Sequence, residues 1–225
     1  MSTITAVDRR GLVDLTDQLR DTAEWLENWL MNLDTPVSPR APIAMSQNDP
    51  AYAAIHFAGG DYWTFANGGC YVTDVAMVAS QVYPFAECDP PRVAKALQMA
   101  ECFRGAELVH PQRITAAYPL LEWPTDAYYN RSGDRMPAQA MQRVHEHLEA
   151  YKSLIVKVDY RPENYYFNMH FVLLVEAVGD EDFVIIDPLD GQRVSLLERY
   201  GDSRGWSVEQ ALFGYRALRP KVGAV

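Results

Sequence analysis

The chain has 225 residues, of which 48% are hydrophobic and 22% are charged; this balance is typical of a packed globular protein and not of a disordered or collagen-like one. The formal net charge of -10 and the lack of a Lys/Arg-rich run argue against a nucleic-acid partner, because phosphate binding needs a basic face. The three cysteines, Cys70, Cys88 and Cys102, show no C-x-x-C spacing, which argues against a disulfide framework and a four-cysteine zinc site.

The first residues lack the basic head and apolar core of a signal peptide. No window approaches the roughly 20 apolar residues that a membrane span requires. We therefore expect synthesis in the cytoplasm without a signal peptide, and no membrane span. Association with a virion, or release on cell lysis, is compatible with this expectation.

An N-terminal helix is predicted over residues 1–33. Apolar residues recur there at steps of three and four and form a narrow stripe of Leu12, Leu15, Leu19, Leu26, Trp29 and Leu33. Two interpretations stay open: an amphipathic helix lying across the next domain, or a coiled coil that gives a homo-oligomer or docks to a larger assembly through residues 11–33. Residues 34–42 contain three prolines and are predicted to be a linker, so the main domain is expected over 43–225.

Cys70 lies at the predicted start of a helix. Apolar residues fall on helical spacing over 71–82, directly after the Asn-Gly-Gly turn at 67–69. The free N–H groups and the dipole of a helix N-terminus favour a thiolate, so Cys70 is a candidate nucleophile, and the two glycines before it can let the backbone turn sharply. The alternative is a small buried thiol at a helix start, since free cysteine is among the most buried residue types.

The last third of the chain changes to strands. Apolar, β-branched and aromatic runs predict strands over 154–158, 171–178 and 183–186. With helices predicted over 92–102 and 138–151, this order indicates an α+β domain.

His170 opens the second predicted strand, and Asp187 ends the third. If these strands pair antiparallel, the start of the first lies opposite the end of the second, and the two side chains can hydrogen-bond. A carboxylate on an imidazole orients a general base. Taken singly, each residue is more often structural than functional.

Residues 47–191 resemble the papain-like peptidases of the bacteriocin-leader (double-glycine) peptidase-like group, including stand-alone members from bacteria and phages. The matching motifs are Ser46-Gln47-Asn48-Asp49-Pro50, then Gly69-Cys70 with Thr73 and Ala76-Met77, then His170-Phe171-Val172 with Asp187-Pro188 and Gly191. The resemblance implies a papain-like fold, in which a helical part carries the nucleophile and an antiparallel sheet carries the histidine and the aspartate. It also implies that Gln47 supplies an oxyanion donor beside Cys70, His170 and Asp187.

The implied function is a cysteine peptidase that hydrolyses a peptide or isopeptide bond through a thioester on Cys70, with no cofactor. Leader peptides and peptidoglycan (cell-wall) peptides are the implied substrates, and a phage or bacterial endopeptidase associated with a particle fits the N-terminal segment. Tyr71 follows the cysteine where many relatives have a small residue, which predicts a differently shaped cleft. His145 and His147 face different sides of a helix, so no metal pair is expected.

Two other functions stay open. The chain can be a catalytically inactive papain-fold binding or structural module of a phage-type assembly, with aromatic side chains such as Trp63 lining a groove. Acyl transfer to an amine in place of water uses the same triad.

Overall fold

The computed structural model describes residues 39–58, 61, 63–105, 107–124, 136–163, 167–179 and 181–221. All of them belong to one compact unit, Val37–Val222. The helix predicted over 1–33, and with it the question of a coiled coil, lies outside the described residues. Within the described ranges, no helix has the length and apolar character needed to cross a lipid bilayer.

The described part is mixed α+β, as expected, with helices and antiparallel sheets. Its helices are α2 (Phe65–Gly68), α3 (Cys70–Ala79), α4 (Phe85–Cys88), α5 (Pro90–Met99), α6 (Ile114–Ala117), α7 (Ala138–Tyr151), α8 (Leu196–Tyr200) and α9 (Val208–Ala211), with 3₁₀ turns at Pro111–Arg113 and Asp202–Arg204. Its strands are β1 (Phe103–Arg104), β2 (Glu107–Leu108), β3 (Leu121–Glu122), β4 (Leu154–Asp159), β5 (Met169–Val178), β6 (Asp182–Asp187), β7 (Gln192–Ser195), β8 (Gly214–Arg216) and β9 (Arg219–Pro220).

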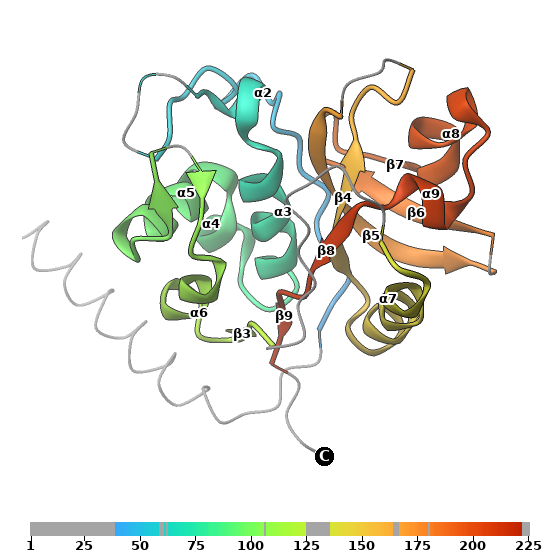
Figure 1. Ribbon diagram of the computed structural model, residues 1–225. Helices are drawn as coiled ribbons and strands as arrows, with labels where there is room; N and C mark the ends of the chain where they lie inside the picture. Colours follow the sequence, from blue (N-terminus) through green and yellow to red (C-terminus); the bar gives the residue numbers. More distant parts are fainter. Residues whose placement is uncertain are drawn as a thin grey trace, which may run out of the picture. The chain divides into compact units, whose positions relative to one another are not determined.

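The helix α3 is buried along its whole length after its first residue, because Tyr71 to Ala79 are all buried. Figure 1 shows α4, α5 and α6 on one side of α3, the main sheet on the other, and α2 above the start of α3. The sheet has five strands in the order β7-β6-β5-β4-β8, and every neighbouring pair is antiparallel. The central strand β5 has the most extensive contact with α3.

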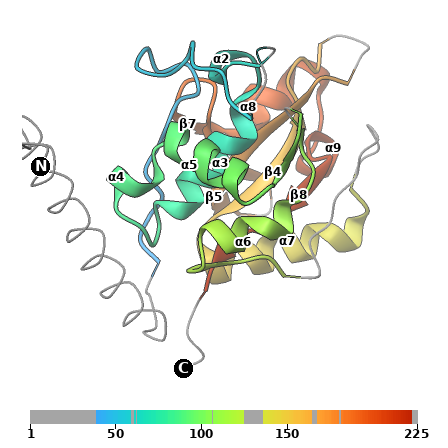
Figure 2. The same cartoon turned by 90° about the vertical axis from the view of Figure 1, so that its left-hand side faces the viewer.

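The helix α7 covers the other side of the sheet (Figure 2), where its apolar face packs on β4, β5 and β6. Val144 and Leu148 of α7 join Val156, Val172 and Ile185 of the strands in one buried cluster. This burial explains why a helix with the predicted amphipathic pattern forms over Ala138–Tyr151.

The predicted helices at 71–82 and 92–102 begin and end earlier than expected, at Cys70–Ala79 and Pro90–Met99. The shift of α5 has a local cause: the Asp89 side chain accepts a hydrogen bond from the Arg92 N–H, and proline occupies the first helical positions.

The proline-rich stretch predicted as a linker is described only from residue 39 onward. Arg40 binds the end of α3 there: its N–H donates to the Gln81 carbonyl at 3.1 Å and its Nε to the Ser80 carbonyl at 2.6 Å. Residues 39–42 are therefore attached to the domain.

A β-bulge in β5 determines which side chains share a face of the sheet. Near the turn, Ala177 pairs with Phe183, but further along Leu174 pairs with Ile185, so β5 contains one extra residue between these pairs. Continued from there, the register sets Asp187 opposite residue 172, two residues from His170 and on the same face. Without the bulge, Asp187 would oppose residue 173 and point to the other face.

Candidate active site

Cys70 is the first residue of α3 and is partly exposed. Within the described residues its N–H has no hydrogen-bond acceptor, as is usual for the first turn of a helix. The sulfur borders a cavity of about 840 Å³. The structure thus gives Cys70 the helix N-terminus that was predicted for it.

The two glycines before Cys70 serve packing and not an unusual backbone turn. Gly69 has an ordinary right-handed conformation (φ -77°, ψ -3°). A Cβ atom there would lie 2.6 Å from the carbonyl oxygen of Phe65, and one on Gly68 would lie 2.7 Å from the Trp63 ring. We expected these glycines to allow a sharp turn; instead they allow Phe65 and Trp63 to approach the backbone closely.

His170 lies near the start of β5, and the residue is 5% exposed. Its Nε2 donates to Oδ1 of Asp187 at 2.9 Å, and the Cys70 thiol interacts with the same side chain. Because Nε2 is used by the carboxylate, Nδ1 is left for the sulfur. His170 thus lies between Cys70 and Asp187 and interacts with both.

The residues after the cysteine and the histidine hold these two together. The rings of Tyr71 and Phe171 stack with their centroids 4.7 Å apart, which ties α3 to β5. The Arg216 guanidinium lies over both rings, at 5.6 and 5.7 Å from their centroids. Tyr71 is therefore part of the support of the site.

Asp187 is fully buried and accepts four hydrogen bonds. Besides the bond from His170, Oδ1 accepts from the Leu189 N–H at 2.9 Å, while Oδ2 accepts from Arg199 Nη1 at 2.8 Å and from the Tyr200 hydroxyl at 2.5 Å. Arg199 also binds Asp190. Sequence reasoning missed Arg199 and Tyr200, since no motif marks them and only the packing of α8 brings them to Asp187.

These contacts shift the pKa of each group in the direction that charges it. Burial disfavours the charged form in all three. The hydrogen bond and positive charge of His170, helped by the N–H groups of Phe171 and Tyr71, outweigh burial and lower the pKa of Cys70. The interactions of His170 with Asp187 and Cys70, which accept its N–H groups, raise the pKa of His170 to about 10, and His170 lowers the pKa of Asp187. The arrangement favours a thiolate beside an imidazolium.

The two other cysteines have the opposite environment. Cys88 and Cys102 are buried, and burial raises the pKa of each thiol to about 11. Of the three thiols, only Cys70 has a lowered pKa.

Gln47 lines the same cavity as Cys70 and is 5% exposed. Its Nε2 donates to the Ala66 carbonyl at 2.9 Å, and its N–H donates to the Pro188 carbonyl at 2.6 Å. Ser46 Oγ and Asn48 Nδ2 both bind the Leu189 carbonyl. The segment 46–48 is therefore attached to the turn that follows Asp187, and Gln47 lines the same cavity as Cys70 and His170.

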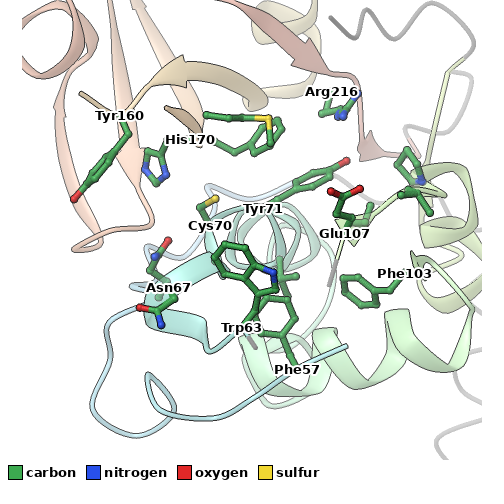
Figure 3. A pocket seen from close by; sticks show the side chains of 18 of the residues that line it. Phe57, Trp63, Asn67, Cys70, Tyr71, Phe103, Glu107, Tyr160, His170 and Arg216 are labelled. Carbon is green, nitrogen blue, oxygen red and sulfur yellow. The ribbon is translucent and has the colours of Figure 1, made fainter. Parts of the chain in front are cut away.

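The walls of the cavity are rich in aromatic side chains. Figure 3 shows Trp63, Phe57 and Phe103 on the far side of Cys70 from Tyr160 and His170. Trp63 and Tyr160 are 36% and 37% exposed, so both offer ring surface to a ligand. Trp63 thus lines the cavity, as expected for an aromatic groove.

A nucleophile, a base with an orienting carboxylate and an amide beside them can perform acyl chemistry at a carbonyl carbon. Among the described residues, no group of three or more His, Cys, Asp and Glu side chains could hold a metal ion. In comparisons with protein-family models, curated proteins and solved structures, no match was found.

Proposed function

We propose that this chain is a papain-like cysteine peptidase that hydrolyses a peptide or isopeptide bond with Cys70 as the nucleophile. One observation carries the proposal: Cys70 interacts with His170, which binds Asp187 at 2.9 Å, although the helix that carries Cys70 lies far in the sequence from the two strands that carry His170 and Asp187. The lowered pKa of Cys70, beside two thiols whose pKa values are raised, supports a role in chemistry.

In the first half of the reaction, the Cys70 thiolate attacks the carbonyl carbon of the substrate, and the C=O electron pair moves onto the oxygen. When this tetrahedral intermediate collapses, the C–N bond breaks, and His170 gives its Nδ1 proton to the leaving amine. A thioester on Cys70 remains. In the second half, neutral His170 takes a proton from water as the water attacks the carbonyl carbon of the thioester. The C–S bond then breaks, the acid product is released, and the thiolate and the imidazolium are restored.

The oxyanion formed in each half needs hydrogen-bond donors. The Cys70 N–H, which has no acceptor within the described residues, is one candidate, and Nε2 of Gln47 is the other because its second hydrogen is not used by Ala66. The hydrogen bonds between segment 46–48 and the turn after Asp187 support a fixed position for this amide. Such preorganised donors each contribute about 10²–10³ in rate.

The substrate is proposed to be a peptide, with bacterial cell-wall peptides as the first class to test. A cavity of about 840 Å³ exceeds the volume of one side chain and leaves room for several residues of an extended peptide. Its aromatic walls favour apolar side chains, or sugar rings attached to the peptide, over highly charged segments. Association with a phage-type particle through residues 11–33 is part of the same proposal.

The test compares wild type with Cys70→Ala and His170→Ala on purified peptidoglycans and on a mixture of peptides, with mass spectrometry of the products. We expect new amine and acid termini with wild type only, and loss of activity after iodoacetamide treatment. Products that carry an added amine would indicate acyl transfer. Identical results for wild type and Cys70→Ala would refute the peptidase proposal and favour a catalytically inactive binding module.

A further inference from the structure

Asp74 is a second buried carboxyl group of this centre, and the proposed reaction does not use it. It lies on α3, is 0% exposed, and neither of its carboxyl oxygens has a hydrogen-bond partner within the described residues. Asp187, equally buried, accepts four hydrogen bonds, one of them from the positively charged Arg199. A carboxylate without such donors is far more costly to bury than a neutral acid.

Asp74 follows Cys70 by four residues, so the two side chains lie on the same face of α3, and that of Asp74 leans toward the N-terminus. The charged groups that act on it are Cys70 of the same helix, His170 of β5 and Asp187 of β6. Burial first, and then the negative charge of Cys70, raise the pKa of Asp74 well above its ordinary value.

We propose that Asp74 is a positioning residue that acts through Cys70: it stays a neutral acid while the sulfur is a thiolate, so that the two share one negative charge. Two like charges this close in a buried place do not both ionise. The sulfur holds the charge because His170 pairs with it, whereas Asp74 has no donor. An ionised Asp74 would oppose both the thiolate and the oxyanion. The role toward the thiolate rests on the proposed function, but the protonation of Asp74 does not.

The first test measures unfolding by urea between pH 5 and 7 for wild type, Asp74→Asn and Thr73→Val. Thr73 is the matched control, since it is 0% exposed and its hydroxyl also lacks a partner, but it does not titrate. In the unfolded chain, Asp74 has a pKa of roughly 3.9. Below that pH the group is protonated in both states and its contribution to stability is fully present. The contribution is lost as pH rises, because the unfolded state ionises while the folded state keeps the proton.

We expect the ratio of the unfolding constants of wild type and Asp74→Asn to rise about tenfold per pH unit, because unfolding of wild type releases one proton. The ratio for Thr73→Val should not change with pH. A ratio for Asp74→Asn that is also independent of pH would overturn the proposal. So would a shift of Cys70 alkylation to lower pH in Asp74→Asn, which would mean that Asp74 is ionised in the native protein.

The second test uses the unmutated chain and does not depend on the folding of a variant. Infrared spectra should contain the carbonyl band of a protonated carboxylic acid at neutral pH. This band disappears when the pH is raised and the acid ionises, and the pH at which it disappears should become lower once iodoacetamide has made Cys70 uncharged. No band at neutral pH, or the same titration before and after alkylation, would contradict the shared charge. Neither test needs a substrate, so failure of the peptidase proposal is seen separately, in the product assay.

Discussion

Replacing Asp187 by Asn tests how the buried carboxylate acts on His170. The change keeps the size of the side chain but removes the negative charge 2.9 Å from His170 Nε2. It also turns an NH₂ group toward Arg199 Nη1. In wild type this Nη1 donates to the carboxylate from 2.8 Å, and it cannot accept a hydrogen bond from the new NH₂ group, because it has no free lone pair. An opposite charge at such distances shifts a pKa by about 1–3. We expect the pKa of His170 to fall from about 10 to roughly 8 in the variant.

The sign of this shift predicts which side of the pH profile changes. His170 must be protonated to release the amine, so activity ends on the alkaline side where the imidazolium loses its proton. The alkaline limb of kcat/KM should therefore move about two pH units lower. At every pH, kcat/KM should fall by about 10²–10⁴, because the ring is also less well oriented. NMR titration of the His170 ring measures the pKa without substrate.

Asp190→Asn is the matched control. The change removes the negative charge of a neighbouring carboxylate. Arg199 also binds this carboxylate, at 2.5 Å, but within the described residues His170 does not contact it. Its alkaline limb should stay near that of wild type. An equal shift in both variants would mean that general charge and not the contact with His170 sets the pKa, and a His170 pKa near 10 in Asp187→Asn would refute the reasoning.

Three further changes probe the supports of the site. Gln47→Ala should lower kcat by about 10²–10³ without slowing Cys70 alkylation, and an unchanged kcat in steady-state assays would exclude an oxyanion role. Tyr200→Phe removes the hydroxyl that donates to Asp187 at 2.5 Å; urea denaturation should show a loss of about 1–3 kcal/mol in the free energy of unfolding. Gly69→Ala puts a Cβ 2.6 Å from the Phe65 carbonyl oxygen; the unfolding free energy should fall by about 1–3 kcal/mol, and a wild-type melting curve would mean that the backbone moves aside at little cost.

Much of the local structure could be predicted because periodicity and turn residues act over short distances. The helix that begins near Cys70 and the strands that carry His170 and Asp187 were expected from apolar spacing, and they form within a few residues of the expected positions. The α+β class follows from the same pattern. The boundaries of α3 and α5 differ from the expected ones by one to three residues, since capping by Asp89 and the surrounding packing decide where a helix begins and ends.

The donors around Asp187 could not be predicted. Arg199 and Tyr200 belong to a helix of five residues, α8, whose sequence carries no functional signal. The burial of Asp74 was equally hidden, because an aspartate one turn after Cys70 would ordinarily be assigned to an exposed face. In each case the deciding contacts join segments that sequence patterns do not relate to each other.

The sequence by itself determined that a cysteine begins a helix, that a histidine opens a strand and that an aspartate ends the next one. Only the tertiary structure decided that His170 and Asp187 share a face. A plain hairpin from the turn at 179–181 would have set them on opposite faces, because side chains alternate along a strand. The extra residue between Leu174 and Glu176 reverses that alternation, and the cross-strand pairing that accommodates it is not written in any local pattern.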